Sequence, residues 1–144
     1  MKKVNPRDTT TGKVHEEMAI AALNKGGYKY ETQKVIGQRL KGGKHKVDFL
    51  VSAPNGEQVL VEMKWQQVPG TTEQKIPFEI ISLADAVQKN KEKFKKAYIV
   101  LGGEGWTLRK YYLGGDIFQY LRNCDQVEII SLEAFVAKAN QGKL

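Results

Sequence analysis

The sequence is poor in cysteine, in proline and in long apolar runs. Its 144 residues include 1 cysteine, Cys124, and 4 prolines. A single cysteine excludes an intrachain disulfide and a cysteine-rich zinc site, and it suits a reducing compartment. Apolar stretches such as Tyr98–Leu101 are far shorter than the roughly 20 residues that span a bilayer. Met1–Asp8 has lysines with no apolar segment after them, so no signal peptide is indicated. We therefore expect an intracellular, cytoplasmic protein.

Length and charge narrow the class further. A chain of 144 residues fits one domain, residues 1–144, because two domains would each have a marginal core. Apolar residues make up 41%, near the globular average, so a packed core is expected. Lys and Arg number 23 against 16 Asp and Glu, a net charge of +7. Such an excess often serves a polyanionic partner, although many proteins carry it for solubility alone. The charge suggests a nucleic-acid partner. Charge alone does not establish this partner, so the sequence must also contain a functional site that acts on nucleic acid.

Hydrophobic alternation and turn residues predict an α/β fold. Thr9–Gly12 offers N-cap residues for a first helix, and Gly37–Lys46 has the composition of a mobile basic loop. The predicted elements are a helix from Lys13 to about Lys25, strands at Tyr28–Ile36, Lys46–Ser52 and Gln58–Trp65, a helix from Pro77 to about Lys93, a strand at Lys96–Leu101, one or two short helices in Gly102–Asn123, a strand at Val127–Ile130, and a helix capped by Ser131 and ending near Asn140. This order, αβββαβαβα, implies a central mixed β-sheet flanked by helices.

A predicted hairpin brings two acids and a lysine together. The Asn55-Gly56 pair favours a tight turn between two apolar-rich strands. If Asn55 lies at the centre, Asp48 and Glu62 are each seven residues away and lie opposite each other on the same face. Strand alternation then places Lys64 on that face too. The other face, with Val47, Phe49 and Val51 on one strand, is apolar. A slip of one residue would separate the two acids.

This face has the chemistry of a metal-dependent phosphodiesterase. Two adjacent carboxylates repel each other unless a cation lies between them, and oxygen ligands suit Mg²⁺. The cation would activate water and offset phosphate charge, while Lys64 orients the water or stabilises the phosphate. The alternative is an ordinary exposed sheet face with a Glu–Lys pair. Asp48 at the mirrored position of the hairpin argues against it.

Two motifs carry a family resemblance. Asp48, followed after thirteen residues by Glu62-Met63-Lys64, resembles the PD-(D/E)XK signature of restriction-endonuclease-like nucleases, with Val47 in the place of the proline. Gly12-Lys13-Val14-His15-Glu16 resembles the start of archaeal-type Holliday-junction resolvases. The resemblance covers about residues 12–65. It implies a restriction-endonuclease-like sheet, Mg²⁺ with Mn²⁺ as a substitute, and DNA phosphodiester hydrolysis that leaves a 5′-phosphate.

The resemblance also implies a helical glutamate in the metal site, beside Asp48 and Glu62. Helical phase favours Glu16, which shares a face with Ile20 and Leu23, whereas Glu17 lies on another face. An acid on the apolar stripe is costly unless it is paired or binds metal. We therefore expect Glu16 to be the third metal ligand.

Beyond Lys64 the likeness changes. Trp65–Lys75 is similar to a stretch after the catalytic lysine of some restriction-type nucleases. Gln66 continues the face of Lys64 and is a candidate for contact with the attacking water or a phosphate, or else a solvated strand end. Glu73 and Lys75 fit simple loop or helix-start residues and are left outside the catalytic assignment.

Basic residues before Asp48 are candidate DNA contacts. They are Arg39, Lys41, Lys44 and Lys46, which would fix the backbone without reading bases. The sequence thus predicts a Mg²⁺-dependent DNA endonuclease, with site-specific (restriction or homing type) cleavage preferred over structure-specific repair or recombination cleavage. A non-catalytic DNA-binding module and an RNA-directed enzyme remain alternatives. Cleavage of two strands would call for a homodimer or a larger assembly.

Overall fold

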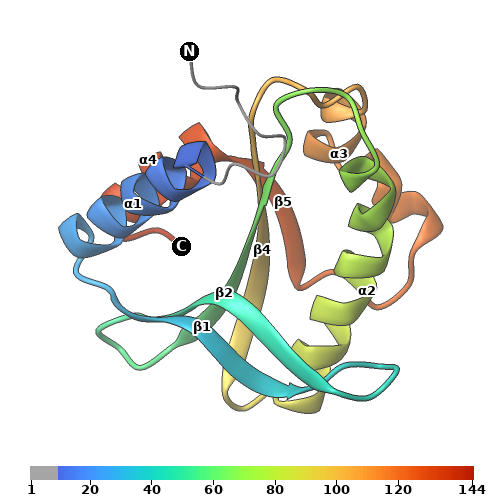
Figure 1. Ribbon diagram of the computed structural model, residues 1–144. Helices are drawn as coiled ribbons and strands as arrows, with labels where there is room; N and C mark the ends of the chain where they lie inside the picture. The colour runs from blue at the N-terminus through green and yellow to red at the C-terminus, as the bar shows by residue number, and fades with distance from the viewer. Residues whose placement is uncertain (1–9) are drawn as a thin grey trace.

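Five strands form one mixed sheet in the computed structural model, which describes residues 10–144 (Figure 1). The strands lie in chain order across the sheet. β2 runs antiparallel to both β1 and β3, whereas β4 runs parallel to both β3 and β5. The bounds are β1 Lys29–Gln38, β2 Lys44–Ser52, β3 Gln58–Trp65, β4 Phe94–Gly102 and β5 Val127–Ser131. The predicted α/β class, mixed sheet and element order are confirmed.

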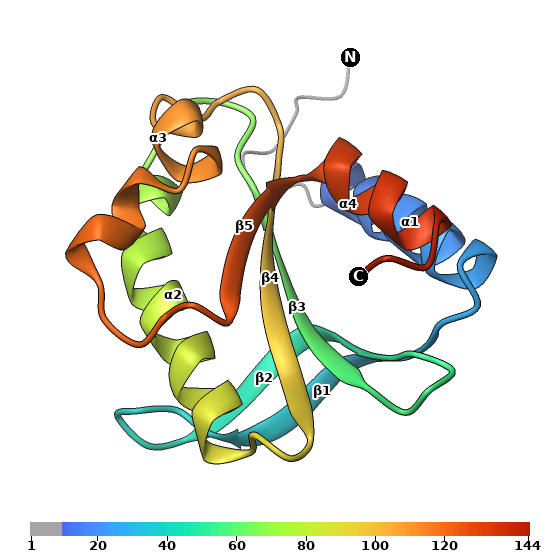
Figure 2. The same cartoon turned by 180° about the vertical axis from the view of Figure 1, so that it is seen from behind.

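Helices cover both faces of this sheet. They are α1 Thr10–Lys25, α2 Thr72–Lys89, α3 Arg109–Leu113 and α4 Leu132–Asn140, with a 3₁₀ helix at Asp116–Tyr120. Figures 1 and 2 show α1 and α4 side by side on one face and α2 with α3 on the other. Because both faces are covered, most positions of the central strands β3 and β4 are apolar. No helix among the described residues is long and apolar enough to cross a membrane.

Each face of the sheet has its own hydrophobic core. Phe49 and Val61 pack with Leu23 of α1 and Phe135 of α4, while Leu60 packs beneath α2. Strand alternation predicts that Val47 joins Phe49, but Val47 packs in the α2-side core. Phe49 is the last residue of β2 that pairs with β3, so Val47 lies where the two strands no longer pair and the simple alternation does not hold.

The predicted basic loop is a hairpin instead. β1 continues to Gln38 and β2 begins at Lys44, so only the turn between them lies outside the strands. The turn is closed by hydrogen bonds from the Arg39 N–H to the Gly43 carbonyl and from the Gly42 N–H to the Arg39 carbonyl, both 2.9 Å. Gly42 and Gly43 have positive φ angles, which glycine adopts without strain. The prediction of a mobile loop was therefore wrong.

Two helix starts also differ from prediction. Described residues Thr10–Gly12 are already helical and do not precede α1, and Thr9 lies outside the described residues. α2 begins at Thr72 and ends at Lys89, so Pro77 lies inside it. Proline lacks the N–H that would bond to the carbonyl of Glu73. The Tyr112 hydroxyl donates to that carbonyl at 2.6 Å, so the carbonyl is satisfied and the helix tolerates the proline.

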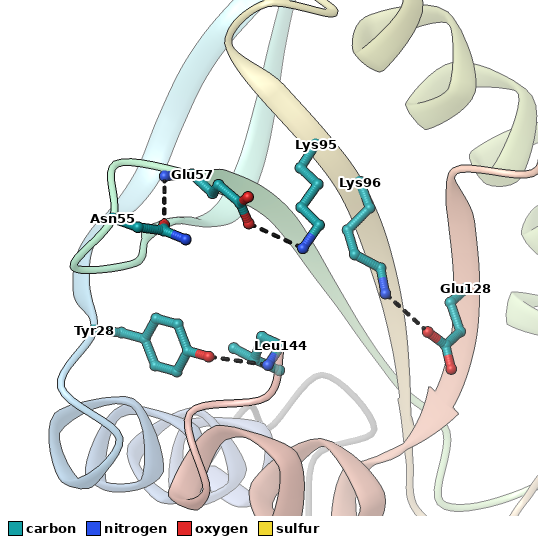
Figure 3. Close-up of polar contacts among 7 residues, drawn as sticks. All are labelled: Tyr28, Asn55, Glu57, Lys95, Lys96, Glu128 and Leu144. Carbon is teal, nitrogen blue, oxygen red and sulfur yellow. Dashed lines mark hydrogen bonds and ion pairs between the residues drawn. The ribbon is translucent and has the colours of Figure 1, made fainter.

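Polar contacts fasten the region where β3 and β4 begin (Figure 3). Lys95 pairs with Glu57 in the turn before β3, at 2.9 Å. The backbone N–H of Leu144 donates to the hydroxyl of Tyr28 at 2.9 Å, which ties the segment after α4 to the segment after α1. Ser131 caps α4 as predicted, since its Oγ accepts from the Ala134 N–H at 3.1 Å.

Candidate active site

The β2–β3 hairpin has the register that the sequence predicts. Phe49 pairs with Val61 and Val51 with Val59, so the two strands are symmetric about Asn55. The Asn55 side chain accepts from the backbone N–H of Glu57 at 3.0 Å and helps to close the turn. The pairing ends at Phe49 and Val61, so Asp48 and Glu62 are the next residues beyond the last pair.

Asp48 is held in place by two donors. The backbone N–H of Met63 donates to Asp48 Oδ2 at 2.7 Å, and the side-chain amide of Gln33 donates to Oδ1 at 3.1 Å. Gln33 lies between the β1 partners of Val47 and Phe49, and its φ of 50° is a left-handed conformation that is unusual for this residue. Local strain of this kind concentrates at functional sites. Gln33 belongs to the candidate site, although no sequence pattern points to it, because a glutamine in a strand carries no specific signal.

Glu62 is the most strongly perturbed acid of this cluster. It is 7% exposed, and burial, a hydrogen bond to Asp48 and the negative charge of Asp48 raise its pKa far above the usual value. Lys64 opposes this shift only partly. A divalent cation between the two carboxyls would remove the cause of the repulsion, so these residues fit a metal ion of the Mg²⁺ type.

Glu16 of α1 lies close enough to Asp48 to be affected by its charge. Its pKa is raised by partial burial, then by Asp48 and Glu17, while Lys13 lowers it. Among residues 10–144, however, no group of three or more acidic, histidine or cysteine side chains is gathered closely enough to hold a metal ion. The structure therefore brings Asp48 and Glu62 into contact and leaves Glu16 as a nearby third acid. Two carboxylates completed by water and substrate phosphate suffice for Mg²⁺.

Lys64 has an acidic partner that the sequence analysis missed. Its Nζ lies 3.8 Å from Oε2 of Glu79, a residue of α2 that is 7% exposed. The other oxygen of Glu79, Oε1, has no hydrogen-bond partner in the described part of the chain. Glu79 also contributes to the raised pKa of Glu62. The site thus includes a residue of α2, which the sequence could not place because nothing in it fixes the docking of a helix.

An open cavity of about 590 Å³ lies over Asp48, Lys64 and Glu16. The side chains that line it come from α1, β2 and the end of β3 and include acids, Lys64 and an apolar group. They are Lys13, His15, Glu16, Glu17, Ile20, Asp48, Met63, Lys64 and Trp65, with Gly12 and Gly102. The rings of His15 and Trp65 stack at one side of this cavity, with centroids 4.1 Å apart.

Gln66 and Glu73 join in a network beside the cavity. Gln66 is 6% exposed and donates to the Gly105 carbonyl at 2.8 Å, so it is no solvated strand end. Glu73 accepts from the backbone N–H groups of Thr107 and Leu108 and from the Thr107 hydroxyl. Burial would raise the pKa of Glu73, but these hydrogen bonds and one from Gln66 lower it overall. These hydrogen bonds favour structural roles for Gln66 and Glu73 over contact with the attacking water. Lys75 is exposed on α2.

The four basic residues chosen as DNA contacts are solvent-accessible. Lys44 and Lys46 lie on β2 and alternate with buried neighbours, so they project from the same side of the strand as Asp48. At about 3.3 Å per residue, Lys46 is about 7 Å along the strand from Asp48. Lys41 is exposed in the turn and Arg39 is partly exposed.

The fold and the site together define a class of protein. A mixed sheet flanked by helices, with Asp48, Glu62 and Lys64 gathered over the β2–β3 hairpin, is the arrangement of a restriction-endonuclease-like nuclease domain. A family model described as "PD-(D/E)XK nuclease superfamily domain" matches residues 7–143. The chain belongs to this superfamily.

Similarity to other proteins is limited. A comparison with curated proteins found no match. Among solved structures, the chain resembles the "Crystal Structure of Protein of Unknown Function AF1548", with a TM-score of 0.50 and 15% identity. The likeness covers 82% of this chain and 58% of that one, so this chain spans somewhat more than half the length of that structure. At this identity the likeness shows the fold alone.

Proposed function

We propose that this protein is a Mg²⁺-dependent DNA endonuclease that hydrolyses phosphodiester bonds, with Mn²⁺ as a substitute metal. The observation that carries the proposal is the contact between Glu62 and Asp48, where Asp48 lines a cavity that Lys64 also lines. Binding of DNA alone requires no acids that face a polyanion. The net charge of +7 supports a nucleic-acid substrate.

Each residue has a distinct role in this proposal. Asp48 and Glu62 would hold the cation, and Glu16 would join through water or after a small movement. Bound there, the cation supplies a more acidic water and charge compensation for phosphate oxygens. Lys64 places a positive charge beside the acids, where it orients the attacking water or offsets the charge of the pentavalent phosphate. Met63 and Gln33 fix the direction of Asp48.

Two kinds of DNA cleavage are proposed, site-specific and structure-specific. The stretch after Lys64 suggests site-specific cleavage, but the contacts of Gln66 and Glu73 support a structural role for that stretch. A separate observation supports cleavage of DNA with irregular structure: the rings of His15 and Trp65 stack in the cavity. If both strands of a duplex are cut, we propose a homodimer or larger assembly, which the molar mass in solution would reveal.

The test is a cleavage assay with plasmid, genomic DNA, a four-way junction and single-stranded RNA, each with Mg²⁺, Mn²⁺ or EDTA. Lys64→Ala is compared with Lys91→Ala, an exposed lysine of the turn after α2. We expect metal-dependent cutting of DNA that Lys64→Ala loses and Lys91→Ala keeps. Tight, metal-independent binding with no cutting would contradict the proposal and favour a binding module. Preferred cutting of RNA would reassign the substrate.

A further inference from the structure

The cavity over Asp48 is larger than a metal site requires. A cation with six waters, at about 30 Å³ each, fills about 180 Å³, whereas the cavity holds about 590 Å³. One part of its lining is acidic and basic, and another part is formed by Ile20, Met63 and Trp65. A hydrated phosphate has no use for an apolar wall.

Trp65 is held in a fixed position on this wall. Its indole ring stacks on His15 with an interplanar angle of 30°. On β4, a Cβ atom added to Gly102 would lie 2.9 Å from a ring carbon of Trp65, so the ring occupies space that only glycine leaves open. Trp65 is nevertheless partly exposed and lines the cavity. A ring that is fixed, partly exposed and beside the catalytic acids is suited to contact a flat ligand.

We propose that the apolar side of this cavity binds an unpaired nucleobase, packed against Trp65, next to the scissile phosphate. The inference rests on the proposed function for the place of that phosphate, since Lys64 and Trp65 are consecutive residues of β3 and line one cavity. Bases stacked within a duplex do not present their faces, so a base can reach Trp65 only from a single strand, a flap, a bulge or a junction. The preferred substrate is therefore DNA with an unpaired nucleotide at the cleavage position.

Aromatic contact with a base makes a measurable difference. Loss of one base–aromatic contact typically weakens binding by about tenfold. Such contact tolerates any base, so the preference depends on DNA structure more than on sequence. The positive charge of the chain favours the DNA backbone in general and does not by itself distinguish paired from unpaired DNA.

The first experiment measures binding in EDTA, so that cleavage plays no part. A duplex, the same duplex with one unpaired nucleotide and the single strand are compared by fluorescence anisotropy. We expect the unpaired forms to bind about tenfold more tightly. Trp65→Ala and Trp65→Leu should lose this preference, Trp65→Phe should keep most of it, and Tyr120→Ala, which removes an aromatic residue that is 73% exposed, should leave it unchanged. Equal binding of all three DNAs, or a preference that survives in a folded Trp65→Leu, would overturn the inference.

A second experiment uses the wild-type protein alone. 5-Iodouracil at the unpaired position should form a photo-cross-link that mass spectrometry locates at Trp65, and a cross-link confined to other regions would overturn the inference. The two proposals fail separately. Metal-dependent cutting without any preference for unpaired DNA overturns this inference and leaves the nuclease. Binding of unpaired DNA through Trp65 without cutting supports this inference and contradicts the nuclease.

Discussion

The Asp48 carboxylate accepts the backbone N–H of Met63 at 2.7 Å, and its contact with the neighbouring Glu62 side chain raises the pKa of Glu62. Because burial and this contact raise the pKa of Glu62, the metal-free folded protein keeps a proton that the unfolded chain loses near the ordinary value of 4.5. The favourable contribution of this group is complete below that value and declines as pH rises towards the raised pKa. A bound cation would favour the deprotonated form of Glu62, so the contribution of Glu62 to stability would then rise with pH.

The first prediction concerns stability against pH. Without metal, the free energy of unfolding should fall between about pH 5 and pH 9, and Mg²⁺ should stabilise the protein most at the upper end. Saturation at a hundred times the dissociation constant corresponds to about 2.7 kcal/mol. Thermal unfolding with Mg²⁺ or with EDTA measures both effects. Glu62→Gln should remove the pH dependence and the Mg²⁺ effect together; a wild-type protein that Mg²⁺ leaves unchanged at pH 8 would contradict the metal site.

The second prediction concerns Glu79. It lies 3.8 Å from Lys64 and fixes where that ammonium group points. Glu79→Gln should lower kcat about tenfold with little change in KM, a size typical for residues that orient a metal-site group. Glu133→Gln, which changes a carboxylate of α4 that is 81% exposed, is the control. Steady-state kinetics in which Glu79→Gln matches the control would show that Glu79 has no positioning role.

The third prediction concerns Glu73 and the loop before α3. Glu73 receives hydrogen bonds from Thr107 and Leu108, and these hold its pKa below the usual value despite burial. Their contribution is present above about pH 4.5 and is lost as pH falls through the lowered pKa. Glu73→Gln should reduce stability at pH 7 by about 2 kcal/mol, a fall in Tm of about 4–8 °C. A variant with unchanged Tm would contradict the structural role.

The hairpin was predictable because its signals are local. The Asn55-Gly56 turn fixes the register, so the sequence could bring Asp48 close to Glu62, directly beyond the last pair of Phe49 and Val61. Glu79 and the stack of His15 on Trp65 could not, because they depend on how α2 and α1 pack on the sheet. The start of α2 was wrongly predicted at Pro77 for a related reason. The Tyr112 hydroxyl, which compensates for the missing N–H of Pro77, comes from a distant segment.

The fourth prediction concerns Lys46, which projects from the same side of β2 as Asp48. Lys46→Ala should weaken DNA binding equally for all sequences and reduce the slope of log affinity against log salt by about 1. Binding titrations at several salt concentrations, with Lys91→Ala as the control, measure this slope. An unchanged slope for Lys46→Ala would remove Lys46 from the path of the DNA backbone.

The most direct test of the metal-dependent nuclease is single-turnover cleavage by Asp48→Asn beside Asp125→Asn, an exposed aspartate before β5. Asparagine can still accept the Met63 N–H, so the fold is expected to survive while the charge that holds the cation is lost. We predict a loss of about a thousandfold for Asp48→Asn, with Tm retained, and wild-type cleavage for Asp125→Asn. Cleavage by Asp48→Asn at the wild-type rate, or wild-type cleavage that persists in EDTA, would contradict the account.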